Sequence, residues 1–179
     1  GGNDTASYAD VTSATSHGLT NLEGMAINLS ENDITDATIG TDLATIAGVG
    51  TVGTGNTSPA GVLAAGTAQY LVTAIGTDKT DGHSIDTLTS IEGIIGSGVN
   101  DYIVLGAGAS TVSAGAGDDM IFSGSGVDNI SGEAGADVSN IGLATDHAAG
   151  ETITGGDGAD RINFTSVLGQ TLVLSANVT

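Results

Sequence analysis

The sequence lacks cysteine and tryptophan, contains one proline, and has only 3% aromatic residues. Without cysteine the chain has no disulfide framework, no Cys-ligated zinc and no thiol catalysis. Basic residues are limited to Lys79 and Arg161. Two cations cannot follow a phosphate backbone or an anionic membrane surface. No apolar run approaches the roughly 18 residues of a membrane-spanning helix. Nucleic-acid binding and membrane insertion are therefore excluded as functions.

The acidic residues create a physical problem that the bases cannot solve. Asp and Glu number 21 in 179 residues, which gives a formal net charge of −19. Such repulsion opposes a compact state, and high charge with few aromatics is typical of disorder. Yet 39% of the residues are hydrophobic, and the mean hydropathy is +0.21, too apolar for a solvated acidic tail. The combination indicates that bound cations neutralise the chain.

A nine-residue repeat begins at Gly96. Its copies are GSGVNDYIV (96–104), LGAGASTVS (105–113), AGAGDDMIF (114–122), SGSGVDNIS (123–131), GEAGADVSN (132–140), DHAAGETIT (146–154) and GGDGADRIN (155–163). The five residues IGLAT interrupt the frame before the sixth copy. Position six is acidic in six of the seven copies, position eight is aliphatic in six, and position four is Gly in five. Three coincident registers make chance a poor explanation.

This frame resembles the RTX nonapeptide, the haemolysin-type calcium-binding repeat G-G-x-G-x-D-x-U-x. The 155–163 copy matches every fixed position, and GGND at 1–4 resembles the tail of another copy. The stretch at 85–101 is similar to the lead-in that often precedes such arrays. Because the chain opens inside a motif, we expect it to be a piece of a longer protein.

The repeat predicts an all-β fold, a right-handed parallel β-roll or β-solenoid with stacked Gly/Asp turns. Each nine-mer supplies a turn over its first six positions and a strand over its last three, in which position eight points inward while its neighbours point outward. Two nine-mers make one complete coil, with a strand on each side, and stacking of coils creates the core. The 146–163 copies keep this phase only if IGLAT bulges out.

We expect three regions: an irregular β-rich region at 1–95 on the N-terminal side, the calcium-binding β-roll at 96–163, and a terminal strand or cap at 164–179. Within 1–95, short strands are predicted at 5–11, 24–30, 68–75 and 85–95 by β-branched content and partial alternation. The Gly- and Pro-containing stretch 48–61 is predicted to be a loop. This region is either a set of coils with lost motifs or a separate β-domain.

Calcium takes six to eight oxygen ligands and tolerates irregular geometry. The resemblance implies several Ca²⁺ ions, held between turn n and turn n+2 by position-six carboxylates and turn carbonyls. The implied side-chain ligands are Asp4, Asp101, Asp119, Asp128, Asp137, Glu151 and Asp160. The implied carbonyl ligands are Gly96, Gly98, Asn100, Gly115, Gly117, Gly124 and Gly126. Ser110 adds no charge at position six, so we expect one edge to bind calcium better. The alternative is that these Asp residues only cap N–H groups in plain connecting turns.

Other acidic or titratable groups are interpreted as surface residues. His17, His83 and His147 are isolated in sequence, and the chain contains no H-E-x-x-H, G-x-S-x-G or P-loop motif. The acids of 78–86 and 31–36 lack the EF-hand spacing and are read as solvated turns. No catalytic residue is therefore predicted, and we expect the chain not to be an enzyme.

The resemblance leads to a calcium-binding structural segment of a secreted bacterial cell-surface protein, an S-layer subunit or adhesin that folds and assembles on Ca²⁺. Its expected partners are calcium and other copies or surface-layer subunits. The alternative is a folding and secretion module of a type I-secreted exoenzyme whose catalytic domain lies outside this chain. A third hypothesis, a sugar- or ice-binding sheet face, needs a regular outward Thr row, and the outward positions are too mixed for that.

Overall fold

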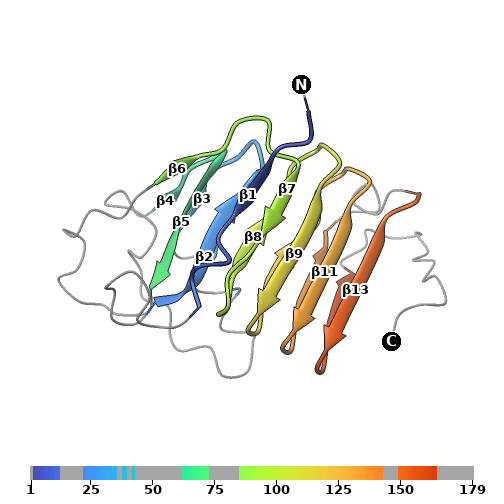
Figure 1. The fold of residues 1–179 in the computed structure, drawn as a ribbon. Helices are drawn as coiled ribbons and strands as arrows, with labels where there is room; N and C mark the ends of the chain where they lie inside the picture. Colours follow the sequence, from blue (N-terminus) through green and yellow to red (C-terminus); the bar gives the residue numbers. More distant parts are fainter. Residues whose placement is uncertain are drawn as a thin grey trace.

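The strands of this protein form two main sheets. The structure is a computed structural model, and it describes residues 2–12, 22–35, 38–39, 42, 62–72, 85–142 and 149–164. Sheet A has the strand order β1-β7-β9-β11-β13, sheet B the order β14-β12-β10-β8-β2-β5-β6, and a small sheet pairs β3 with β4 (Figure 1). The strands are β1 (Thr5–Ser7), β2 (Leu22–Asn28), β3 (Ile34–Thr35), β4 (Val62–Leu63), β5 (Thr67–Val72), β6 (Asp86–Thr87), β7 (Gly93–Ile95), β8 (Tyr102–Val104), β9 (Thr111–Ala116), β10 (Met120–Phe122), β11 (Asn129–Ala134), β12 (Val138–Ile141), β13 (Thr152–Asp157) and β14 (Arg161–Phe164).

From β7 onward, successive strands alternate between the two sheets and pair in parallel. Paired residues lie two repeats apart in sequence, as in Tyr102 with Met120 and Thr111 with Asn129. Across IGLAT the separation grows by the length of that insertion, as in Val138 with Arg161, and the pairing stays in register. The pairings that assumed an unchanged phase across IGLAT are therefore the pairings of the structure. The all-β class and the coil of two repeats are confirmed.

The N-terminal region contributes to the same sheets. Strand β1 pairs in parallel with β7, and β2 pairs in parallel with β8, so both continue the stack of repeats. Beyond β2, the strands β5 and β6 pair antiparallel. Strands form within all four predicted segments. The predicted loop at 48–61 and the predicted terminal strand lie outside the described residues, and the division of the chain at residues 95 and 163 stays a prediction.

Position eight of the repeat forms the core between the sheets, as predicted. Ile94, Val112 and Ile130 of sheet A pack in one cluster with Ile103 and Ile121 of sheet B, and all five are at most 2% exposed. Strands with one inward aliphatic residue bury little individually, so stacking supplies most of the apolar burial. Ser139 is the one residue at position eight of the seven copies that is not aliphatic, and it is buried as well.

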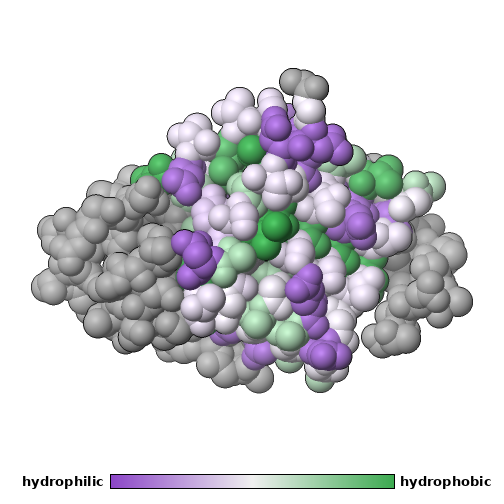
Figure 2. Space-filling view, in the orientation of Figure 1, coloured by the Kyte–Doolittle hydropathy of each residue, from purple (hydrophilic) through white to green (hydrophobic). Residues whose placement is uncertain are grey.

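The outward positions differ between the sheets, which the sequence prediction did not anticipate. On sheet A, Thr5, Thr111, Asn129 and Thr152 are exposed, and hydrophilic and intermediate residues cover most of this face (Figure 2). On sheet B, the equivalent side chains of Ala26, Tyr102, Met120 and Val138 are buried in a second cluster with Ile39 and Leu63. The expectation that both neighbours of position eight face solvent is therefore wrong for sheet B.

Tyr102 anchors this second cluster. Its ring packs against Phe122 with centroids 5.3 Å apart, and its hydroxyl donates a hydrogen bond of 2.8 Å to Asp42.

Helical structure in the described part is confined to residues 38, 39 and 42. No helix there is long and apolar enough to cross a bilayer. Ile39, Asp42 and Leu63, which lie between β2 and β5 in sequence, thus contact the outer face of sheet B. The turns at the strand ends remain as the candidate functional surface.

Candidate metal-binding columns

The parallel registers align position six of every coil into two columns along the edges of the sheets. One, the Asp column, contains Asp101, Asp119, Asp137 and Asp160, each immediately before a sheet B strand. The other, the mixed column, contains Asp4, Glu92, Ser110, Asp128 and Glu151, each immediately before a sheet A strand. The pairings predicted between turn n and turn n+2, which lie in successive coils, are therefore the pairings of the structure.

Within the Asp column, each carboxylate accepts a hydrogen bond from the backbone N–H of its counterpart one coil earlier. The Asp101 N–H donates to Asp119 Oδ1 at 2.7 Å, and the Asp119 N–H donates to Asp137 Oδ1 at 2.9 Å. The Asp137 N–H donates to Asp160 Oδ1 at 3.0 Å. The acidic side chains thus connect neighbouring coils by hydrogen bonds. The alternative interpretation, in which these Asp residues only cap N–H groups in plain connecting turns, did not include such contacts between coils.

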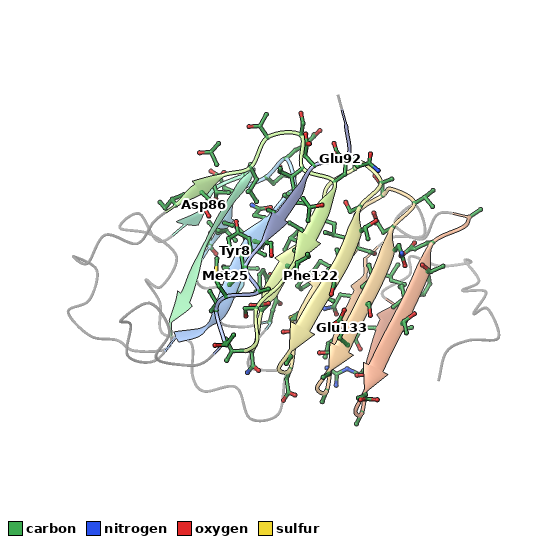
Figure 3. The ribbon with its side chains drawn as sticks, in the orientation of Figure 1. Tyr8, Met25, Asp86, Glu92, Phe122 and Glu133 are labelled. Carbon is green, nitrogen blue, oxygen red and sulfur yellow. The ribbon has the colours of Figure 1, made fainter. Side chains whose placement is uncertain are left out.

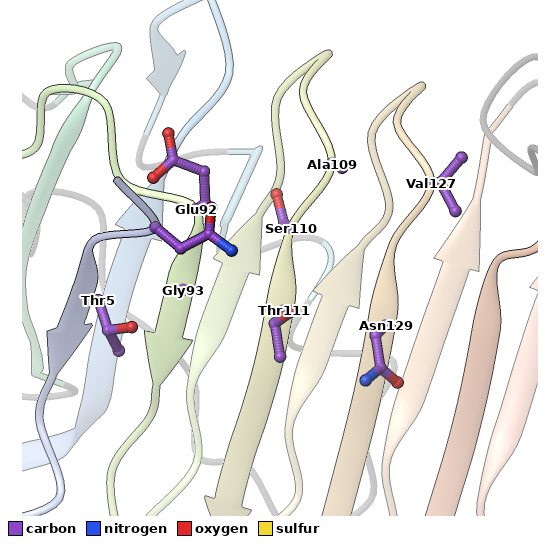
Figure 4. Close-up of a pocket in the computed structure, with 9 residues that line it drawn as sticks. Thr5, Glu92, Gly93, Ala109, Ser110, Thr111, Val127 and Asn129 are labelled. Carbon is purple, nitrogen blue, oxygen red and sulfur yellow. The ribbon is translucent and has the colours of Figure 1, made fainter. Parts of the chain in front are cut away.

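The mixed column uses the same contact. The Ser110 N–H donates to Asp128 Oδ1 at 2.8 Å, and the Asp4 N–H donates to Glu92 Oε2 at 3.0 Å. Glu92 lies at the opposite edge from Glu133 of the Asp-column turns (Figure 3). Beside Ser110 a pocket of about 540 Å³ is lined by Asn3, Thr5, Glu92, Gly93, Ala109, Thr111, Val127 and Asn129 as well (Figure 4). The missing acid at position six therefore coincides with open space.

The second carboxylate oxygen of three column residues has no hydrogen-bond partner. Oδ2 of Asp119, Asp128 and Asp137 is buried and accepts no hydrogen bond, and these residues are at most 2% exposed. Burying an ionised carboxylate with an unpaired oxygen costs several kcal/mol. An oxygen-preferring divalent cation removes that cost, so the donor set fits the calcium that the resemblance implies.

Side chains alone do not complete a site. In the part of the chain that the structure describes, no three His, Asp or Glu side chains converge enough to hold a metal ion. Backbone carbonyls of the turns would supply the remaining ligands of a bound ion. They are close at hand, because coils stack closely at their glycines: a Cβ on Gly124 would lie 1.5 Å from the Gly106 carbonyl oxygen. Gly117, at φ 120°, likewise has no space for a side chain.

The carbonyl ligands proposed from the resemblance are divided between the edges. Gly96, Gly98, Asn100, Gly115 and Gly117 belong to turns of the Asp column, and Gly124 and Gly126 belong to a turn of the mixed column. Glu151 is buried in the mixed column, whereas Asp4 is exposed at its first coil. All fourteen predicted ligands therefore lie on the two edges, and their coordination of calcium stays a prediction.

Asp101 differs from the other column residues. Its Oδ1 accepts hydrogen bonds from the Met25 N–H and the Ser97 hydroxyl, and its Oδ2 accepts one from the Ser97 N–H, all at 2.6 Å. Met25 occupies the position-six place on β2. Both oxygens of Asp101 thus accept hydrogen bonds from the protein. This carboxylate connects β2 to the repeats without needing an ion.

Burial shifts the pKa values of the column carboxylates upward. Burial, together with the charges of Asp160 and Asp118, raises the pKa of Asp137 to about 6. The pKa of Asp119 is raised by burial and then by the charge of Asp101, and burial also raises the pKa of Asp101 and Asp128. Without metal, these buried carboxyl groups therefore keep their protons to a higher pH than an exposed aspartate does.

Sequence reasoning missed four groups at these edges: Glu92, Met25, Ser97 and Asp118. Glu92 had a signal, since it precedes Asp101 by one repeat length and has Ile94 at position eight, although its turn lacks the glycines. Among the surface interpretations, Asp33 Oδ1 accepts the Ala65 N–H at 3.0 Å, and Asp86 accepts the Tyr8 hydroxyl at 3.3 Å. Both therefore accept hydrogen bonds from residues far away in the sequence. Asp36, Asp78, Asp81 and the three histidines lie outside the described residues.

Comparison with known families gives a match for the repeats. Residues 95–130, 124–140 and 149–164 match the RTX calcium-binding nonapeptide repeat, in 4 copies. Residues 95–164 therefore contain calcium-binding RTX repeats, which confirms the resemblance drawn from the nine-residue frame. Neither the comparison with curated proteins nor that with solved structures gives a match.

The raised pKa values predict that protons substitute for metal. Because the folded state holds protons that the unfolded state releases above about pH 4, metal-free stability is greatest in acid and falls as pH rises through about 6 and beyond. We expect the free energy of unfolding in chelator to decrease between about pH 5 and 8. Asp137→Asn should flatten this dependence, and exposed Glu31→Gln should not. A flat or rising wild-type profile contradicts the prediction.

The hydrogen bonds of Asp101 predict a metal-independent contribution to stability. Asp101→Asn places an amide N–H₂ against the Ser97 N–H or hydroxyl, so it should lower the free energy of unfolding by about 1–3 kcal/mol. Urea denaturation should show this loss both with calcium and in chelator. The matched variant Asp128→Asn should lose stability only with calcium. An Asp101→Asn loss confined to the calcium-bound state would instead make Asp101 a metal ligand.

Proposed function

We propose that this chain is a calcium-dependent structural segment, a right-handed parallel β-roll, of a type I-secreted bacterial cell-surface protein such as an S-layer subunit or adhesin. The observation that carries the proposal is the pair of position-six columns, whose buried carboxylates leave Oδ2 of Asp119, Asp128 and Asp137 without a partner. Alternation of strands between two parallel sheets, with partners two repeats apart, supports the β-roll.

Calcium acts here as a folding ligand. Bringing the acids of each column together without cations opposes folding, because the chain carries a net charge of −19. Ions bound between coils neutralise that charge and supply partners to the buried oxygens, so metal binding and folding are coupled. Export in the unfolded state, followed by folding in external calcium, is consistent with such coupling.

The proposed role is architectural, with no catalytic step assigned to any residue. Assembly with other copies or with surface-layer subunits is part of the proposal. The exposed Thr, Ser and Asn positions on sheet A are available for such contacts, since sheet B buries its equivalent positions.

Coupled folding predicts a calcium-specific transition. Calcium titrated into chelator-stripped protein should produce a cooperative increase in the β signal in far-UV circular dichroism. Magnesium at the same concentration should produce much less, because it demands near-octahedral geometry and loses water reluctantly. A fully folded spectrum in EGTA that calcium leaves unchanged would rule out the coupling.

The gap at Ser110 predicts a gain of binding. Ser110→Asp restores an acid to the mixed column between Glu92 and Asp128, beside the pocket of about 540 Å³. Isothermal titration should show tighter calcium binding or one more ion per chain, and the metal-free protein should be less stable because of the added repulsion. Ser131→Asp, which adds the same charge on the outward side of β11, is the control. Equal binding by the two variants would contradict a continuous column.

A further inference from the structure

The N-terminal coils of the stack satisfy their buried position-six groups without an ion. Up to the end of β9, Asp101 is the one buried acid among the residues that the structure describes, and its two oxygens accept hydrogen bonds from Ser97 and Met25. Met25 takes the position-six place on β2 and is apolar. Ser110, before β9, adds no charge. Nothing buried in these coils therefore requires a cation.

From β10 onward the buried acids are only half satisfied. Oδ2 of Asp119, Asp128 and Asp137, which precede β10, β11 and β12, is buried and accepts no hydrogen bond. Acids are also denser here, because residues 114–164 contain nine acids and one base, whereas 1–113 contains twelve acids and one base in more than twice the length. Desolvation of unpaired oxygens and repulsion between acids therefore both oppose folding of β10–β14 more than folding of β1–β9.

Apolar packing differs along the stack in the same direction. Ile27 of β2 and Ala68 of β5 are 0% exposed and belong to the same cluster as the inward residues of the repeats. A second cluster on sheet B contains further residues from between β2 and β5. At the other end, Ser139 replaces the aliphatic residue on β12, and Ile153 and Ile162 are only partly buried. Apolar burial therefore favours the N-terminal coils.

Strands β8 and β9 lie between these two ends of the stack (Figure 1). The Asp101 N–H donates to Asp119 Oδ1 at 2.7 Å, and the Asp101 carbonyl accepts the Met120 N–H at 2.9 Å. The Ser110 N–H donates to Asp128 Oδ1 at 2.8 Å. The N-terminal coils hold β8 and β9 in place, so these strands present a formed edge on which the next coil can pair.

We infer that the stack consists of a metal-independent foundation, β1–β9, and a calcium-dependent extension, β10–β14, which folds on the edge of β8 and β9. The inference rests on the proposed calcium binding and adds where in the chain calcium acts. Calcium supplies the partner that the buried oxygens of the extension lack, whereas the foundation has no such requirement. The extension therefore stays unfolded where calcium is scarce, and calcium controls the length of the ordered stack.

Hydrogen–deuterium exchange of the full chain, read by mass spectrometry, tests this division. In EGTA at neutral pH, we expect peptides from β2, β5 and β8 to exchange at least roughly 100-fold more slowly than peptides from β12–β14, because the free energy of local opening differs between the two parts. Calcium should slow exchange in β12–β14 strongly and change β2 and β5 little.

A matched pair of variants separates the two parts. Asp101→Asn disturbs the contacts with Ser97 and Met25, so it should speed exchange of β2 and β8 in EGTA. Asp137→Asn should leave β2 and β8 unchanged in EGTA and reduce the protection that calcium gives to β12–β14. The wild-type comparison needs neither variant, so it decides the question even if Asp101→Asn fails to fold.

Two results would contradict the inference in different ways. Equally fast exchange of all strands in EGTA, with equal protection of all strands in calcium, overturns the division and leaves the proposed function standing. Equally slow exchange of all strands with and without calcium contradicts the proposed coupling of folding to calcium as well. The failure of the inference and the failure of the proposed function are therefore distinguishable.

Discussion

One contact organises the molecule: a position-six carboxylate accepts the backbone N–H of the same position in the coil before it. This contact consumes one oxygen of the acid and aligns the turns into columns. The other oxygen is then buried by the alignment it helped to create. The geometry that holds the coils in register therefore also produces the unmet demand for a cation.

The two columns illustrate how a repeat divides its work between residues of one type. Asp101 is satisfied by Ser97 and Met25 and attaches the repeats to β2, whereas Asp119 and Asp137 retain unpaired oxygens. An aspartate at position six therefore does not have a fixed role. The residues around each aspartate determine whether its second oxygen is hydrogen-bonded or unpaired. The mixed column shows the same principle, since Ser110 interrupts it beside a pocket.

Much of the architecture could be predicted because it follows from a short period. The nine-residue frame correctly placed the inward aliphatic residues, the coil of two repeats and the partners within each column. It could not find Met25 or the cover of sheet B, because these depend on contacts between segments far apart in sequence, such as Tyr102 with Asp42. Nor did any periodicity mark Asp101 as different, since its partner on β2 lies outside every repeat.

The longer sequence separation between paired strands across IGLAT has a consequence for how such a chain can change over time. Strand register is preserved on both sides of the insertion, from Asn129 with Thr152 to Val138 with Arg161. The five extra residues therefore leave the coil phase unchanged, so this corner tolerates an insertion of that length. Variation in sequence length can accumulate there, and new surface loops can be acquired without disturbing the stack beneath.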